Sequence, residues 1–436
     1  MRLSVIGIGY LGLTHAVCMA DLGHDVVAID VDEDKLGLAA KGEVPFFEPG
    51  LAPLLRKNLD SGRLRFTSSY ADVAQSAQVH FLCVGTPQSH DGGADLTYVH
   101  GAAAALAPHL RDACLVVGKS TVPPGTARQV MSQLWAAAPA GNKVGVAWNP
   151  EFLREGFAVE DTLNPGRVIF GVTSESDVMT LRDVYRYVLE AGTPWLAMDL
   201  ETAELVKVSA NAFLATKISF INGMAEVCEA VGADIMALSR ALSYDDRIGR
   251  RSLSPGAGFG GGCLPKDVRA FRATGRQLGL DSLDRFLGEV EAINMGRRAR
   301  LAALAREMLD GSMWGKRVAV LGVAFKPNSD DVRDSPSLDV CQQLARAGAV
   351  VSVHDPAAMQ NAARLCPDLH YRTSVRDAAQ AADLVLHVTE WPEYRAIDPS
   401  ALVAVVARPN LIDARCVLDA DLWRAAGWSV RVLGQP

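Results

Sequence analysis

The 436-residue chain contains no run of about 18 uncharged apolar residues, which is the length that a membrane-spanning helix needs. A signal peptide is also missing, because residues 1–7 lead directly into a predicted strand. We therefore expect a soluble protein of the cytoplasm. The apolar share of 49% allows large buried cores, and a chain of this length is expected to form two or three domains.

Basic residues are not in excess, since the formal net charge is -7. A nucleic-acid-binding surface normally carries a basic stripe, so this balance argues against that class of partner. Anionic small molecules remain possible ligands, because a few local Lys and Arg side chains suffice to hold a phosphate.

The eight cysteines are scattered along the chain and include no CxxC pair. This pattern fits neither a zinc site nor a disulfide framework, so we predict no metal site and a reducing compartment. We expect seven of the thiols to pack as small apolar residues: Cys18, Cys83, Cys114, Cys228, Cys341, Cys366 and Cys416.

Cys263 is the exception, because it lies in the glycine-rich segment 258–267. Glycines let the backbone approach a ligand closely, and the neighbouring Lys266 favours the thiolate that acts as a nucleophile. The alternative is a buried thiol in a glycine-rich turn.

A dinucleotide-binding fingerprint opens the chain. A strand at residues 2–6 leads into GIGYLG at residues 7–12, a helix follows to Gly23, and a second strand ends at Asp30. This order places a pyrophosphate on the helix N-terminus, and the acid binds the ribose hydroxyls, which favours NAD over NADP. The alternative is only a tight turn. A hydride acceptor and a nucleophilic cysteine on one chain suggest oxidation through a thioester.

Buried strands are predicted at residues 79–84, 114–118 and 144–147. Ligands of open parallel sheets bind beyond the carboxyl ends of the strands, so we expect Thr86 and Thr121 near the cofactor. Two further segments, 316–322 and 350–355, repeat the strand-then-acid pattern but lack the glycine fingerprint. This second unit is expected to bind something other than a dinucleotide pyrophosphate.

Long helices are predicted at residues 202–231 and around 283–309, as a spine that offers a dimer surface. The fold class is therefore α/β, with two Rossmann-like doubly wound domains joined by a long central helix. We expect an NAD-binding domain at residues 1–200, a helical dimerisation region with the cysteine loop at 201–310, and a second Rossmann-like domain at 311–436.

Three groups of polar residues are further candidates. Lys207 and Asn211 share one helix face and can hold an oxyanion, although such a pair is often only a solvated surface. Glu151 and Glu155 can position or deprotonate water, or serve only a helix N-terminus. The loop 324–337 carries Lys326 and Arg333, which either meet phosphates or are merely solvated.

Several of these segments, in this order, resemble the UDP-glucose/GDP-mannose dehydrogenase family over essentially the whole chain. The matching motifs are GIGYLG at the start, KSTVPPGT (119–126), NPEFLREG (149–156), the Lys207/Asn211 helix, GFGGGCLPKD (258–267) and AFKPNSDDVRDSP (324–336).

The resemblance implies a four-electron oxidation of a nucleotide sugar by two NAD molecules, through a thiohemiacetal and a thioester on Cys263. It implies oxyanion stabilisation by Lys207 and Asn211, and handling of water and protons by Thr121, Glu151 and Asp267. The product of the UDP-glucose branch is UDP-glucuronate, a precursor for polysaccharide biosynthesis.

The fingerprint and the resemblance together place NAD on Gly7, Gly9, Tyr10, Leu11, Gly12, Asp30, Lys35, Thr86, Thr121, Glu155, Lys266 and Arg333. The resemblance places the nucleotide sugar on Glu151, Phe152, Leu153, Arg154, Glu155, Lys207, Asn211, Arg247, Ser252, Leu253, Ser254, Pro255, Gly256, Gly260 and Lys326. In this family Arg247 can come from the partner subunit, so a homodimer is expected.

Segments 245–256 and 389–391 look most like the UDP-glucose branch, with GDP-mannose and UDP-N-acetylhexosamines as alternative substrates. Gly262 stands where the family often has Ser, and segment 293–297 lacks a frequent Gln. Two other functions remain as rivals. A single-step hydroxyacid dehydrogenase needs no thiol, and a non-catalytic sensor needs none of the catalytic set.

Overall fold

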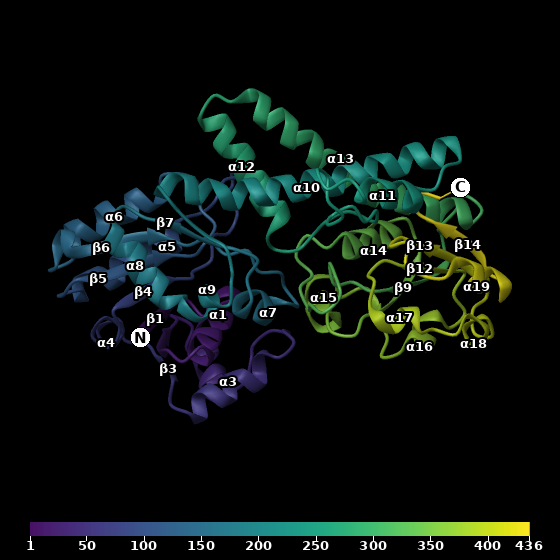
Figure 1. Cartoon of the computed structure of the whole chain (residues 1–436). Coiled ribbons are helices and arrows are strands. Elements are labelled where there is room, and N and C mark those ends of the chain that lie inside the picture. The colour runs from purple at the N-terminus through teal and green to yellow at the C-terminus, as the bar shows by residue number, and fades with distance from the viewer. Residues whose placement is uncertain (436) are drawn as a thin grey trace. The chain divides into compact units, whose positions relative to one another are not determined.

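The computed structural model describes residues 1–435 and divides into two compact units. The first unit spans Met1–Ala210 and the second begins at Asn211, so the division falls within helix α10 (Leu200–Val231). Each unit contains its own sheet (Figure 1).

The sheet of the first unit has eight strands in the order β3-β2-β1-β4-β5-β6-β7-β8. The first six are parallel and follow the doubly wound dinucleotide-binding order. Strand β7 runs antiparallel to β6, and β8 is parallel to β7. The strands are β1 (Arg2–Ile6), β2 (Asp25–Ile29), β3 (Leu64–Thr67), β4 (Val79–Leu82), β5 (Cys114–Gly118), β6 (Val144–Trp148), β7 (Val168–Gly171) and β8 (Trp195–Met198).

Helices cover both faces of this sheet because its strands are apolar on both sides. In β2, Val26 and Ala28 belong to one core cluster, whereas Val27 and Ile29 belong to another. The helices are α1 (Tyr10–Asp21), α2 (Glu33–Ala40), α3 (Leu51–Asp60), α4 (Tyr70–Ser76), α5 (Thr97–Leu106), α6 (Thr126–Ala137), α7 (Ala158–Leu163), α8 (Glu175–Val184) and α9 (Arg186–Glu190), with 3-10 turns at Ala107–His109 and Gly141–Lys143.

The second unit has a six-stranded sheet in the order β11-β10-β9-β12-β13-β14, parallel throughout. Its strands are β9 (Arg317–Leu321), β10 (Val350–His354), β11 (His370–Tyr371), β12 (Leu384–His387), β13 (Asn410–Asp413) and β14 (Ser429–Val432). Its helices are α11 (Ile235–Ser243), α12 (Leu264–Gln277), α13 (Asp281–Met308), α14 (Pro336–Arg346), α15 (Met359–Leu365), α16 (Val375–Ala379), α17 (Pro392–Arg395), α18 (Pro399–Val403) and α19 (Ala420–Ala425).

The predicted fold class is confirmed by these two sheets, which are parallel except for the β6–β7 pair, and by the long helix α10. The helix expected at residues 202–231 spans Leu200–Val231, and the one expected near 283–309 spans Asp281–Met308. Among the described residues, none of the helices combines the length and the apolar content that a membrane-spanning segment needs.

Candidate active site

The three glycines of the first turn have three different roles. Gly7 adopts a φ of 91°, which an L side chain rarely tolerates. A Cβ at Gly9 would meet nothing within 4 Å, so the backbone is open there to a close ligand. A Cβ at Gly12 would lie 1.8 Å from the Gly7 carbonyl oxygen, so only glycine fits. Helix α1 starts at Tyr10, with Leu11 in its first turn, and its N-terminus suits a pyrophosphate.

Asp30 follows β2 beside this turn and is half-buried. Its carboxylate accepts the N–H of Ile8 at 2.7 Å and the N–H of Asp32 at 3.0 Å. A carboxylate has about four acceptor sites, so capacity remains for ribose hydroxyls. Lys35 lies in the next helix, where its ammonium is 3.0 Å from the Asp32 carboxylate. The first turn and Asp30 therefore suit an adenine dinucleotide.

Thr86 and Thr121 lie in the loops that follow β4 and β5. The buried hydroxyl of Thr86 donates to the Thr121 carbonyl at 2.9 Å, and the Ser120 hydroxyl donates to the Val84 carbonyl at 2.6 Å. These bonds join two neighbouring loops at the carboxyl edge of the sheet, which is where ligands of this fold bind.

Glu151 and Lys207 form an ion pair within the first unit. The carboxylate and the ammonium are 2.8 Å apart, with only 11% and 5% of the side chains exposed. The second oxygen of Glu151 accepts the N–H of Leu153 at 2.7 Å. Lys207 is therefore not on a solvated helix face, and its charge is compensated by an acid that can also accept a proton.

The remaining residues of the segment 151–155 are held by local contacts. The Arg167 guanidinium lies 3.8 Å from the Phe152 ring centroid. Arg154 is exposed and pairs with Asp161 at 2.7 Å, whereas Glu155 is buried. The segment therefore presents two acids of different exposure, Glu151 and Glu155, in one short loop.

Sequence reasoning missed Lys119, which is buried directly after β5. Its ammonium donates to the side chain of Asn149 at 2.8 Å and to the Tyr185 hydroxyl at 3.3 Å. Burial lowers the pKa of Lys119 to about 8. These bonds fix the start of the loop that carries Glu151. The sequence signal that could have pointed to Lys119 was a lysine directly after a predicted buried strand.

Glu204 was also missed, although it lies one helical turn before Lys207. Its buried carboxylate accepts the N–H groups of Gly125 and Ala127, both at 2.6 Å, at the N-terminus of α6. Burial raises the pKa of Glu204 to about 7. This contact ties the loop that contains Thr121 to the helix that carries Lys207.

Cys263 is the one exposed thiol among the eight cysteines, all of which lie in the described chain. It caps the N-terminus of α12, where the partial positive charge of the helix favours an anion. Burial raises the pKa of Cys18 and Cys83 to about 12 and that of Cys114 to about 11. The alternative of a buried Cys263 is thus excluded, and the predicted packing of the other thiols is confirmed for the five that are fully buried: Cys18, Cys83, Cys228, Cys341 and Cys366.

Asp267 lies one turn after Cys263 on α12 and is buried. Its carboxylate accepts the amide N–H of Asn211 at 2.6 Å and pairs with the Lys266 ammonium at 2.7 Å. Asn211, Asp267 and Cys263 are therefore brought together within the second unit, as the sequence motifs predict.

The glycines around Cys263 face the protein itself. A Cβ at Gly260 would lie 2.4 Å from the Asp334 carbonyl oxygen, and one at Gly261 would lie 2.7 Å from the Phe325 ring. At Gly262 it would lie 2.3 Å from the Arg333 guanidinium carbon. We expected these glycines to admit a ligand; instead they let the cysteine loop and the loop 322–335 pack against each other.

In this packing the Cβ position of Gly262 lies against the guanidinium of Arg333. A Ser at position 262 would displace the end of a flexible arginine, which is exposed and ion-paired with Asp331 at 2.7 Å. The departure from the family pattern at Gly262 therefore affects the space beside the end of the Arg333 side chain.

The segment 252–256 is fixed by three helices. Asn222 on α10 accepts the N–H of Gly256 at 2.8 Å, and the Ser239 hydroxyl on α11 donates to the Leu253 carbonyl at 2.7 Å. Arg297 on α13 donates to the Gly256 carbonyl at 3.3 Å. Ser252 has a φ of 63°, and the remaining members of the segment are Ser254 and Pro255. By contrast, Arg247 is exposed and contacts Asp245 at 2.6 Å.

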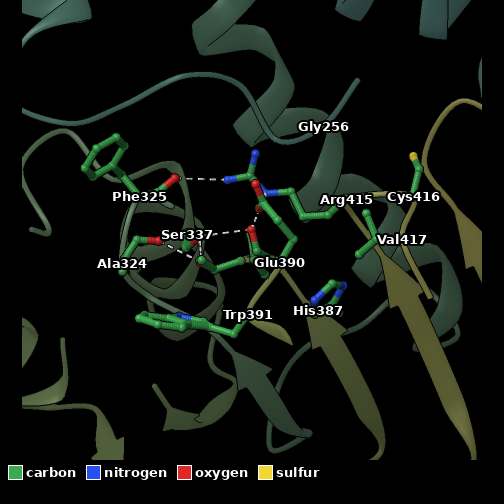
Figure 2. A network of polar contacts seen from close by, with 12 residues as sticks. Gly256, Ala324, Phe325, Ser337, His387, Glu390, Trp391, Arg415, Cys416 and Val417 are labelled. Carbon is green, nitrogen blue, oxygen red and sulfur yellow. Dashed lines mark hydrogen bonds and ion pairs between the residues drawn. The ribbon is translucent and has the colours of Figure 1, made fainter. Parts of the chain in front are cut away.

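Lys326 and Arg415 are two basic residues of the second unit, and Arg415 lies against Gly256 of this segment. The Lys326 ammonium is 5.2 Å from the Phe325 ring centroid. Arg415, which sequence reasoning missed, donates to the carbonyls of Phe325 at 3.3 Å and Val388 at 2.5 Å, and pairs with Glu390 at 3.2 Å (Figure 2). A Cβ at Gly256 would be 3.2 Å from its guanidinium. One cation, Arg415, thus lies beside the predicted substrate segment.

Asp355 is the counterpart of Asp30 in the second unit, yet it is fully buried. It accepts the N–H groups of Val323, Ala324, Ala357 and Ala358 at distances from 2.7 to 3.0 Å. The Trp391 indole donates a fifth bond at 3.2 Å. The carboxylate is therefore saturated by the protein, and it cannot receive a ribose as Asp30 can.

Comparison with known proteins assigns these units. Models of the UDP-glucose/GDP-mannose dehydrogenase family match the chain in three parts: the NAD binding domain at residues 1–189, the central domain at 201–296 and the UDP binding domain at 319–420. The UDP-glucose 6-dehydrogenase of Rhizobium meliloti (strain 1021) is 41% identical over 441 residues, which cover all of both chains.

Two solved structures are similar to this fold. A UDP-glucose dehydrogenase from Pyrobaculum islandicum has a TM-score of 0.90 at 38% identity, covering 98% of each chain. A UDP-D-ManNAc dehydrogenase from Pyrococcus horikoshii has a TM-score of 0.87 at 26% identity, covering 100% of this chain and 99% of that one. With its three domain matches and its full-length relatives, the chain belongs to the UDP-glucose/GDP-mannose dehydrogenase family.

Proposed function

We propose that this enzyme converts UDP-glucose, two NAD+ and water to UDP-glucuronate and two NADH. The observation that carries the proposal is the exposed thiol of Cys263 at the N-terminus of α12, next to the Asn211–Asp267 pair. A single-step dehydrogenase does not need such a thiol. The similarity to UDP-glucose 6-dehydrogenases over the full chain favours UDP-glucose as the substrate.

The proposed reaction proceeds in three stages. NAD+, held by the glycine turn and Asp30, would supply the hydride acceptor for both oxidations, one molecule for each. The first oxidation turns the C6 hydroxyl of the sugar into an aldehyde as its proton leaves. The Cys263 sulfur adds to the aldehyde carbon to give a thiohemiacetal, and removal of a second hydride and a proton leaves a thioester. Water then cleaves the thioester, which releases the carboxylate and restores the thiol.

Within this scheme Lys207 and Asn211 stabilise the oxyanions that form at C6. Their positions one turn apart on α10 support the role, as does the burial of both side chains. Glu151, paired with Lys207, together with Thr121 and Asp267, positions water and carries its protons.

We assign NAD binding to residues 1–200, the cysteine loop and dimerisation to residues 201–310, and UDP binding to residues 311–436. The open glycine turn and Asp30 support the first assignment. The cation Arg415, which lies beside Gly256 of the segment 252–256, supports the third. The remaining cofactor and substrate contacts are those that the motifs predict.

We also propose a homodimer, in the cytoplasm where NAD and nucleotide sugars are available. The supporting observation is a set of large apolar side chains exposed on α10 and α13 of the single chain: Phe213, Leu214, Phe220, Val227, Val231, Phe286, Ile293 and Met295. Arg247 is exposed and suits a contribution to the partner's site.

A panel of nucleotide sugars tests the proposal. The purified protein is incubated with NAD+ and UDP-glucose, GDP-mannose or a UDP-N-acetylhexosamine, and NADH is measured against the uronate formed. We expect two NADH per UDP-glucuronate. Preference for the acetylated sugar would favour the second candidate, suggested by the likeness to the Pyrococcus horikoshii enzyme. One NADH per sugar would overturn the thioester scheme, and no NADH with any sugar would favour the sensor.

A further inference from the structure

A buried carboxylate in the first unit is not used by the proposed reaction. Glu48 lies in the loop between α2 and α3, and only 7% of the residue is exposed. One of its oxygens accepts the Tyr10 hydroxyl and the N–H of Gly156, the latter at 2.7 Å. The other accepts the N–H of Ala158, also at 2.7 Å.

No cation balances this carboxylate, since no ion pair involves Glu48 in the part of the chain that the structure describes. Burying a charge without a counter-ion is unfavourable unless hydrogen bonds replace the lost hydration. Three neutral donors supply those bonds here. The arrangement therefore depends on all three segments being in place around one side chain.

The three donors come from the two segments that are predicted to hold the two substrates. Tyr10 directly follows Gly9 of the cofactor turn and begins α1. Gly156 and Ala158 directly follow the substrate segment 151–155. The Tyr10 hydroxyl also lies 3.0 Å from the Gly156 nitrogen, and its ring packs on Phe46 at 4.8 Å between centroids.

A simple helix cap accounts for only part of this geometry. Helix α7 begins at Ala158 and its N-cap residue, Phe157, makes no side-chain capping bond, so Glu48 replaces the cap from a distant loop. That role requires the two backbone donors alone. The bond from Tyr10 is additional, and it is the one that reaches the cofactor turn.

The segment 151–158 is thus held at both ends. Lys207 holds Glu151 at 2.8 Å, and Glu48 holds Gly156 and Ala158. We propose that Glu48 is a positioning residue that transmits occupancy of the NAD turn, through Tyr10, to the substrate segment 151–158. This inference rests on the proposed function, because it assigns the two segments to the two substrates.

The test uses Glu48→Gln and Tyr10→Phe in the full chain. Glu48→Gln keeps the shape but turns an N–H toward a donor, and Tyr10→Phe removes only the link to the cofactor turn. We expect the KM for UDP-glucose to rise about 10-fold in each variant, while in Glu48→Gln, which changes none of the predicted cofactor contacts, the affinity for NADH alone stays within about 3-fold. The double variant should be no worse than Glu48→Gln, since both remove one linkage.

Hydrogen exchange supplies a readout that needs no sugar. In the unaltered protein, saturating NADH should slow exchange in the segment 151–158, and both variants should lose that response. Asp21→Asn is the matched control: it removes a carboxylate at the other end of α1 that contacts Lys57 at 2.7 Å, and should leave the response intact.

Two results would overturn the inference. One is a Glu48→Gln protein that melts at a lower temperature but keeps the KM and the exchange response, which would indicate a structural cap only. The other is a Tyr10→Phe protein, expected to fold, that keeps both. Failure of the proposed function is distinct, because the unaltered protein would then oxidise no sugar while its exchange response to NADH remained measurable.

Discussion

The two units share a strand order but not a ligand turn. In the first unit β1 ends at Ile6 and α1 begins at Tyr10, so a short glycine turn leads directly to a helix N-terminus. In the second unit β9 ends at Leu321 and α14 begins only at Pro336. The intervening loop carries Lys326 and packs on the cysteine loop. The same sheet therefore supports a dinucleotide site in one unit and a different site in the other.

The acid that follows the second strand of the fold also differs between the two units: it is Asp30 in the first unit and Asp355 in the second. Asp30 accepts two hydrogen bonds from the backbone and is half-buried. Asp355 accepts four from the backbone and one from the Trp391 indole, and it is fully buried. Trp391 is the source of the fifth bond, which the Asp30 carboxylate does not have. The two acids therefore differ in how many of their acceptor sites the protein itself uses.

The largest expected effect separates cofactor binding from covalent chemistry. Cys263→Ser should lower uronate formation by at least ~10³-fold, because a serine hydroxyl is a poor nucleophile at the aldehyde without an added base. NADH binding, assigned to the first unit, should stay unchanged. Titration calorimetry with NADH and a coupled assay for uronate measure the two properties on one sample.

Cys114→Ser provides the control, because that thiol is half-buried at the start of β5 and outside the proposed chemistry. It should retain activity. A Cys263→Ser protein with full uronate formation would refute the thioester scheme.

The next effect compares the two acids directly. Asp355→Asn should cost about 3 kcal/mol of unfolding free energy, since an amide cannot accept all five bonds. Asp30→Asn should have a small effect on unfolding but weaken NAD binding about 10-fold or more, because it loses a charged acceptor for the ribose. Chemical denaturation and NADH titration of both variants measure this contrast.

If Asp355→Asn weakened NAD binding instead, and Asp30→Asn did not, the roles assigned to the two acids would be reversed. A Trp391→Phe variant isolates the indole bond, and should destabilise the second unit by less than Asp355→Asn does.

The smallest effect concerns two buried charged residues at corresponding strands of the two sheets. Lys119 directly follows β5, and Asp413 is the last residue of β13. Burial lowers the pKa of Lys119 to about 8, below its unfolded value. Burial acts to raise the pKa of Asp413, but bonds from His387 and the backbone outweigh it and hold that pKa below its usual value. A lowered pKa in the folded state makes stability rise with pH for a base and for an acid alike, and the two cases differ only in the pH range over which this happens.

For Lys119 the stability contribution is present above the unfolded pKa and is lost as the pH falls through about 8. Relative to that of Lys119→Met, the free energy of unfolding of the unaltered protein should therefore rise by about 1 kcal/mol between pH 8 and pH 9. For Asp413 the contribution to stability is lost only in acid. The difference in unfolding free energy from Asp413→Asn should therefore shrink as the pH falls below the pKa that aspartate has in the unfolded chain. Urea titrations at several pH values measure both differences; a Lys119 difference that is flat from pH 8 to pH 9 would contradict the first.

The sequence alone predicted the buried parallel strands and the long helix, because their residue patterns are local. The strands at residues 2–6 and 114–118 coincide with β1 and β5, because apolar runs bounded by glycines mark buried parallel strands. The long helix was predictable from its spacing and its lack of proline. The sequence also marked Asn211, Cys263 and Asp267 as candidates, and the structure places Asn211 against Asp267, one helical turn from Cys263, in one unit. Their catalytic roles stay predictions.

What the sequence does not reveal depends on partners far along the chain. Glu48 meets residues 156 and 158, and Arg415 meets residues 325 and 390, with no periodicity that links them. The roles of Gly260 and Gly261 also follow from a loop that packs against them from about 70 residues away. Burial and tertiary contact, rather than propensity, decide these features.

The exposure of a single sulfur has a practical consequence. Because Cys263 alone among the eight thiols is exposed, a maleimide or a fluorinated thiol reagent should modify one position without any cysteine being removed by mutation. A fluorine label placed there would report, by its NMR shift, each arrival of cofactor or sugar near the α12 N-terminus. The enzyme thus carries a built-in attachment point for spectroscopy, and the same point is open to covalent inhibitors.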